Sequence, residues 1–141
     1  MRRCRLYADG GARGNPGPAA AGAVIYQIDA DGNLGKKVAE AGDYLGVATN
    51  NQAEYRAIIL GLKKAKELNF EMVDAYLDSE LAVKQLNGEY RVKNEALAKL
   101  FIEVHNLKQR FHTVEFSHIG REHNKEADAI VNKTIDEALG V

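Results

Sequence analysis

Four acidic side chains stand where the sequence pattern indicates a task beyond surface charge. Asp9 and Asp78 each end a short apolar run that predicts a strand. Glu54 and Asp128 fall on or beside the apolar stripes of two predicted helices, near the helix N-termini. An ionised carboxylate is costly to bury unless it is paired or bound to a metal. We therefore expect these four groups to converge on one site.

The chemistry of such a site follows from its ligands. Four carboxylates close together repel one another unless cations lie among them, and a purely oxygen ligand set suits Mg²⁺ or Mn²⁺ rather than zinc. Two such ions about 4 Å apart can clamp the attacking and leaving oxygens of a phosphodiester displacement. Metal-assisted phosphoryl transfer is the reaction class that this arrangement predicts.

The elements that must position these acids can be assigned from periodicity and turn signals. The residues after Asp9 are rich in Gly and Pro, which predicts that the first strand ends there. Thr49 and Gln52 have the form of a capping box at the start of a helix that ends near Asn69. The predicted strands are residues 4–8, 19–28, 37–45, 72–78 and 113–118, and the later helices are residues 80–86, 93–110 and 124–139.

This order of elements predicts an α/β fold with a five-stranded mixed sheet and helices on both faces. Short connections make the first three strands an antiparallel meander, and right-handed crossovers place strands four and five parallel to strand one. Asp9 and Asp78 then lie at the same carboxyl-end edge of neighbouring strands, the edge where open α/β sheets bind ligands.

Length and composition indicate the number of domains and the class of protein. The 141 residues are 45% hydrophobic and show no repeat or linker, which predicts a single domain over residues 1–141. The formal charge of −1 argues against a strong nucleic-acid binder, unless bound cations change the local field. One cysteine excludes an internal disulfide, and neither a signal peptide nor a membrane span is evident. We expect a soluble, cytoplasmic protein that acts as a monomer.

Five short motifs in order resemble the successive signatures of type 1 ribonuclease H, over about residues 5 to 135. They are YADGG at residues 7–11, GNPG at 14–17, TNNQAEY at 49–55, LDS at 77–79 and NKEAD at 124–128. The resemblance implies the ribonuclease H fold and hydrolysis of the RNA strand of RNA/DNA hybrids. It also implies that Asp9, Glu54, Asp78 and Asp128 are the metal-binding catalytic acids. These acids would bind two Mg²⁺ ions, for which Mn²⁺ can substitute.

The same resemblance implies how the hybrid is held. Gly10, Gly11 and Asn15 match positions that contact the RNA strand, and Asn50 and Asn51 match positions that contact sugar edges and bases. Such contacts suit recognition by minor-groove shape and 2′-hydroxyls. Helix capping is the alternative role for either of the two helical asparagines. The resemblance also implies, more weakly, that Ser79 contacts the backbone of the substrate.

The sequence departs from the family pattern at the helper residue. Many members have a catalytic-loop histidine ten residues before the last acid, and His118 has that spacing but closes a predicted strand. The pattern around Arg121 instead resembles the branch with an arginine there, which can orient a phosphate but cannot shuttle protons. We favour Arg121 over His118, and His123 can be plain surface.

The second departure concerns the affinity for the substrate. Some members of the family have a basic, Trp-rich insertion that holds the hybrid, whereas here residues 86–93 lead directly to the next helix. The chain therefore resembles the branch without this protrusion, and binding should be salt-sensitive and depend partly on surface cations. Those cations are Arg13, Lys84, Arg91 and Lys93.

Other functions stay open at this point. A non-catalytic nucleic-acid module on the same fold is an alternative, as is secondary activity on double-stranded RNA. A nucleotide-binding loop at residues 10–17 lacks the Gly-Lys-Ser/Thr ending, and a zinc site at His118 and His123 lacks further ligands.

Overall fold

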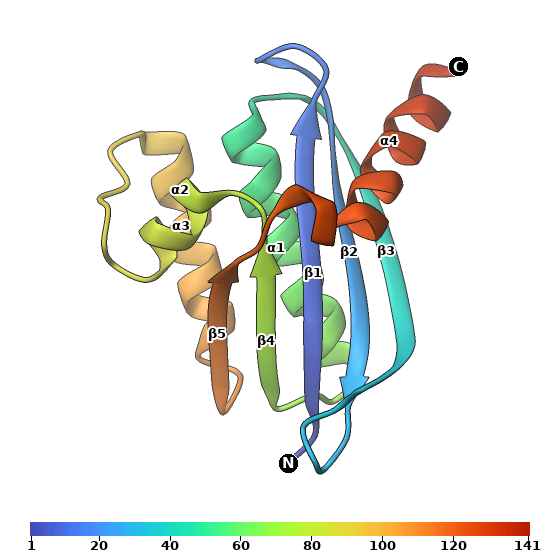
Figure 1. The fold of residues 1–141 in the computed structure, drawn as a ribbon. Helices are drawn as coiled ribbons and strands as arrows, with labels where there is room; N and C mark the ends of the chain where they lie inside the picture. Colours follow the sequence, from blue (N-terminus) through green and yellow to red (C-terminus); the bar gives the residue numbers. More distant parts are fainter.

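The computed structural model describes all residues, 1–141, as one five-stranded sheet with helices on both faces (Figure 1). The strands are β1 (Arg3–Ala12), β2 (Gly17–Ile28), β3 (Leu34–Ala48), β4 (Met72–Leu77) and β5 (Thr113–His118). The helices are α1 (Asn50–Glu67), α2 (Glu80–Leu86), α3 (Glu95–Lys108) and α4 (Lys125–Leu139), with a single 3-10 turn, η1 (Arg121–His123), before α4.

The sheet has the strand order β3-β2-β1-β4-β5, which confirms the predicted topology. β1, β2 and β3 pair antiparallel, and β1, β4 and β5 pair parallel. The parallel register between β1 and β4 ends at the pair Ala8 and Leu77. Asp9 and Asp78 are therefore the first residues beyond this pairing, at the edge where the sequence places them.

The prediction that β1 ends at the carboxylate is wrong. β1 continues from Asp9 to Ala12 because its other neighbour, β2, still supplies hydrogen bonds, in the pairs Gly10 with Ala21 and Ala12 with Ala19. Asp9 thus lies inside a strand that keeps only one partner. β3 also extends beyond its predicted bounds at both ends, since its long antiparallel register with β2 runs from Leu34 to Ala48.

The helices cover the two faces unequally. α1 and α3 enclose the main core of 25 buried side chains on one face, with large contributions from Leu6, Ile58 and Phe70. α4 crosses the other face over β2 and buries a smaller cluster of Ala20, Val131 and Ile135. In Figure 1, α4 lies in front of the sheet and α1 lies behind it.

Glycines allow both helices to approach the sheet closely. A Cβ at Gly10 would lie 2.0 Å from the carbonyl oxygen of Ala53 in α1, and a Cβ at Gly22 would lie 2.7 Å from the carbonyl oxygen of Ala127 in α4. Both distances are far below contact, so only glycine fits at these crossings. The first turn of α1 therefore rests directly on β1, the strand that carries Asp9, and the first turn of α4 rests on β2 at the residue that pairs with Asp9.

The ends of the helices follow the predicted signals closely. Thr49 and Gln52 form the capping box of α1, and Asn94 caps α3, which is shorter by two residues at each end than the sequence predicts. No helix of the chain has the length and apolar character that crossing a membrane requires.

Candidate active site

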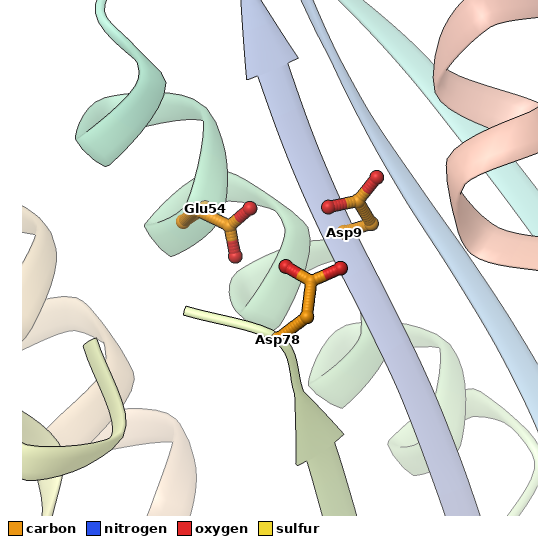
Figure 2. A group of neighbouring side chains, drawn as sticks. All are labelled: Asp9, Glu54 and Asp78. Atoms are coloured by element: carbon orange, nitrogen blue, oxygen red, sulfur yellow. The ribbon is translucent and has the colours of Figure 1, made fainter. Parts of the chain in front are cut away.

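Three of the four predicted acids form a tight cluster. Asp9 from β1, Glu54 from α1 and Asp78 after β4 each offer one carboxylate oxygen, and these oxygens lie within 4.8 Å of one another. Figure 2 shows the three side chains pointing toward one another from their three elements. Asp9 and Glu54 are only 6% and 7% exposed, so two carboxyl groups are buried beside a third that is half-buried.

The position of Glu54 follows from the start of α1. The capping box fixes the first turn of this helix, and the missing Cβ at Gly10 lets the backbone of Ala53 and Glu54 touch β1. The backbone amide of Gly10 then donates a hydrogen bond to Oε1 of Glu54 at 3.1 Å. This hydrogen bond holds the carboxylate of Glu54 beside β1, next to those of Asp9 and Asp78.

Burial and mutual repulsion raise the pKa values of the clustered acids. Burial, and next the charge of Asp78, raise the pKa of Asp9 to about 7. Burial, followed by the charges of Asp9 and Asp78, raises the pKa of Glu54 well above its usual value, although the Gly10 amide acts to lower it. Both shifts have the direction expected of carboxylates that repel one another, and a bound cation relieves that repulsion.

The cluster fits a hard divalent cation. The Oε2 atom of Glu54 is buried and has no hydrogen-bond partner. A buried carboxylate oxygen left without a donor is costly, and a metal ion supplies the missing partner. The ligands are all carboxylate oxygens, with no nearby thiol or imidazole in the group, which suits Mg²⁺ or Mn²⁺.

The fourth acid, Asp128, differs from the prediction that it faces inward. Its side chain is exposed, because α4 buries Ala127, Val131 and Ile135 and Asp128 lies one position further round the helix. It still lines the same cleft as the other three acids, and after burial and the charge of Asp78 its own charge adds to the raised pKa of Asp9. Asp128 therefore lies on the exposed wall of the cleft and not among the buried carboxylates.

Side chains that the sequence analysis missed hold Asp128 and its turn in place. Nδ2 of Asn132 donates to the carbonyl oxygen of Asp128 at 3.1 Å and lies 3.4 Å from its carboxylate. Glu126 accepts a hydrogen bond from the hydroxyl of Tyr26 and pairs with Lys37 at 3.1 Å, which ties the start of α4 to β2 and β3. The spacing of four residues between Asp128 and Asn132 was the only signal in the sequence.

A cleft of about 500 Å³ contains all four acids. Arg121 lines this cleft, whereas His118 lies at the end of β5, outside its lining. The other lining residues include most of the predicted substrate contacts: Gly10, Gly11, Asn50, Asn51 and Ser79.

The polar residues around the β1–β2 turn brace one another. The side chain of Asn50 accepts from the amide of Ala12 at 2.9 Å, and the side chain of Asn15 accepts from the amide of Asn50 at 3.0 Å. Helix capping, the alternative role for Asn50 and Asn51, is wrong because Thr49 performs it. Ser79 does cap its helix, accepting from the amide of Ala82.

The surface cations predicted to support binding are partly engaged elsewhere. Arg13 pairs with Asp136 of α4 at 2.7 Å, and Lys84 pairs with Glu80 at 2.8 Å. Both pairs are solvent-exposed and contribute little to stability. Arg121 also lines the cleft, and in contrast to Arg13 its guanidinium forms no ion pair.

Comparison with known proteins gives consistent matches over almost the whole chain. The family model described as reverse transcriptase-like matches residues 7–134. Ribonuclease HI of Halobacterium salinarum is 40% identical over 136 residues, which are 96% of this chain and 66% of that protein. The bifunctional protein Rv2228c of Mycobacterium tuberculosis is 40% identical over 94% of this chain and 35% of its own length.

Solved structures agree in fold. The N-terminal RNase H domain of Rv2228c superposes with a TM-score of 0.90 at 37% identity, covering 99% of this chain and 98% of that one. LC11-RNase H1, solved in complex with an RNA/DNA hybrid, has a TM-score of 0.87 at 41% identity, covering 96% and 99%. The chain spans about two thirds or one third of the length of the curated relatives above. On these matches and this fold, the chain belongs to the type 1 ribonuclease H family.

Proposed function

We propose that this protein is an endoribonuclease that hydrolyses the RNA strand of RNA/DNA hybrids by a two-metal-ion mechanism. The observation that carries the proposal is the cluster of Asp9, Glu54 and Asp78, whose oxygens lie within 4.8 Å while one buried oxygen of Glu54 has no partner. Such a cluster weakens the fold unless it binds cations, so a binding function explains why it is present.

In this mechanism Asp9, Glu54, Asp78 and Asp128 hold two divalent ions, Mg²⁺ with Mn²⁺ as a substitute. Bound divalent cations supply the charge that activates an attacking water and offsets the charge of the leaving oxygen. Asp128 is exposed on the cleft wall, so it is the acid that solvent and substrate reach most easily. Arg121, free of ion pairs in the same cleft, orients the scissile phosphate through charge-assisted hydrogen bonds.

The proposal extends to the way in which the hybrid is held. Gly11, Asn51 and Ser79 line the cleft beside the acids, and the Asn15 and Asn50 pair fixes the turn above it. Small polar groups and backbone amides can read groove shape and 2′-hydroxyls without reading sequence. Gly10 also lines the cleft, and its backbone amide already donates to Glu54, so this amide is not the group that contacts the substrate. A hybrid complex of a relative with 41% identity supports the choice of substrate.

The deciding experiment compares cleavage of a labelled RNA/DNA hybrid with matched duplex RNA, single-stranded RNA and duplex DNA. Each substrate is tested with Mg²⁺, with Mn²⁺ and with EDTA, and Asp78→Asn serves as the inactive control. We expect metal-dependent cutting of only the RNA strand of the hybrid. Hybrid binding without cutting under either metal would instead support the non-catalytic module, and cutting of duplex RNA would widen the substrate class.

Three further predictions from the sequence belong to this proposal. A single catalytic domain over residues 1–141, a monomeric state and a cytoplasmic location stay predictions. Light scattering of the purified chain at its assay concentration checks the second of these, and a mass of about 15.5 kDa is expected.

A further inference from the structure

Asn124 is a buried polar residue to which neither the sequence patterns nor the mechanism above gives a role. It lies between η1 and α4 and is 1% exposed, less than any of the four acids. Its Oδ1 atom is buried without a hydrogen-bond partner. A buried amide with an unused acceptor costs free energy, so its donor side must serve a purpose that an apolar residue cannot serve.

The donor side of Asn124 faces two of the strands that carry the acids. Nδ2 donates to the backbone oxygen of Ala8, directly before Asp9, at 2.9 Å. The same nitrogen donates to Oδ2 of Asp78 at 3.2 Å. One amide group thereby sets the distance between Ala8, the last residue of β1 that pairs with β4, and the carboxylate that follows β4.

The backbone of Asn124 reaches a third acid. Its carbonyl oxygen accepts the first hydrogen bond of α4, from the amide of Asp128 at 3.1 Å. Its own amide donates to the carbonyl oxygen of Arg121 at 3.0 Å, which closes the short turn before the helix. Asn124 is thus in direct contact with Asp78, with Asp128 and with the residue that precedes Asp9.

We infer that Asn124 is a positioning residue that holds three of the metal-binding acids in register, through its side chain for Asp9 and Asp78 and through its backbone for Asp128. Carboxylate ligands are generally oriented by hydrogen bonds from neighbouring groups, and loss of such a donor weakens metal binding about 10–100-fold. This inference depends on the proposed role of the acids as cation ligands.

An amide suits this position better than the alternatives. Ala8 and Asp78 both present acceptor oxygens, so the group between them must carry two donors. A carboxylate there would add charge to a cluster that already repels itself. A lysine would supply donors, but its length and charge do not fit a fully buried site next to the core.

The experiment measures metal binding directly, apart from activity. Asn124→Ala removes both donors, and Asn124→Ser keeps one hydroxyl donor on a shorter side chain. The matched control is Asn87→Ala, because the amide of Asn87 also donates to a strand carbonyl, that of Phe116 at 3.3 Å, without touching an acid. Titration calorimetry with MnCl₂ and with MgCl₂, and thermal unfolding in EDTA, are recorded for each variant.

We expect Asn124→Ala to bind Mn²⁺ and Mg²⁺ about 10–100-fold more weakly than the unsubstituted protein, and Asn124→Ser to lie between them. Asn87→Ala should bind both ions normally even if its melting temperature falls. In assays of hybrid cleavage, the Asn124 variants should recover part of their lost kcat as Mg²⁺ is raised, while KM for the hybrid stays constant.

Two outcomes would overturn the inference. One is unchanged metal affinity in Asn124→Ala together with a lower melting temperature in EDTA, which would limit the residue to a structural role. The other is failure of both Asn124 variants to fold while Asn87→Ala folds. If the unsubstituted protein itself binds neither ion, the proposed function fails first, and that result is separate from any effect of Asn124.

Discussion

Replacing Asp9 by asparagine removes one charge from the carboxylate cluster and keeps the size of the side chain. In the metal-free protein, burial and the charge of Asp78 raise the pKa of Asp9 from 3.8 to about 7. At pH 8 the folded protein must therefore hold an ionised group that the unfolded chain holds at no cost. We expect Asp9→Asn to be more stable than the unsubstituted protein in EDTA, and to be inactive as a nuclease.

The magnitude follows from the shift in pKa. About three units at roughly 1.4 kcal/mol each give an upper bound of about 4 kcal/mol at pH 8. The new amide needs hydrogen-bond partners in the same buried space, which offsets part of this gain. An increase of about 2 kcal/mol in the free energy of unfolding remains, which corresponds to a rise of roughly 5–10 °C in melting temperature for a chain of this size.

The assay is thermal unfolding at pH 8 with EDTA, and again with excess Mg²⁺. Magnesium should stabilise the unsubstituted protein and leave Asp9→Asn nearly unchanged, because ligand binding to the folded state raises stability by mass action. Asp74→Asn is the matched control, since Asp74 pairs with Arg3 at 2.6 Å and should lose stability rather than gain it. A lower melting temperature for Asp9→Asn in EDTA would refute the argument that the cluster repels itself.

Three other predictions follow from the same geometry. Because the pKa values of Asp9 and Glu54 are raised, the folded protein binds more protons than the unfolded chain between about pH 4 and pH 7, so the metal-free melting temperature should fall as pH rises from 5 to 8 in EDTA. Gly22→Ala should lower the free energy of unfolding by about 1–3 kcal/mol and reduce the cleavage rate, because the new Cβ would lie 2.7 Å from the carbonyl oxygen of Ala127 in α4. Urea unfolding measures the first effect and hybrid cleavage the second. Arg121→Ala should lower kcat on the hybrid roughly 10–100-fold, the value of a charge-assisted hydrogen bond, and His118→Ala should lower it less; the reverse order would return the helper role to the histidine.

The order of the elements could be predicted from local signals. The capping box at Thr49, the alternating strands and the right-handed crossovers depend on short segments and on general rules of chain connection, and the strand order β3-β2-β1-β4-β5 followed from them. The five motifs predicted the family for the same reason, because each combines residues close together in sequence.

The local signals failed where a long-range partner overrides them. The Gly-rich run after Asp9 predicted the end of β1, but β2 continues to pair with it through Ala12. The glycines at positions 10 and 22 are contact points for helices far away in the sequence, which no local pattern reports. The rotation of Asp128 toward solvent also depends on which face α4 turns to the sheet.

The sequence alone therefore predicted that these four acids gather at one edge of the sheet and that divalent cations suit them, because residue type and spacing carry that information. Only the tertiary structure decided where each acid lies in the cleft. Asp9, Glu54 and Asp78 form the buried centre and Asp128 the exposed wall, and Asn124 links β1, Asp78 and the start of α4. These relations depend on how closely helices pack against strands, and distances of that kind are set by the fold as a whole rather than by any one segment.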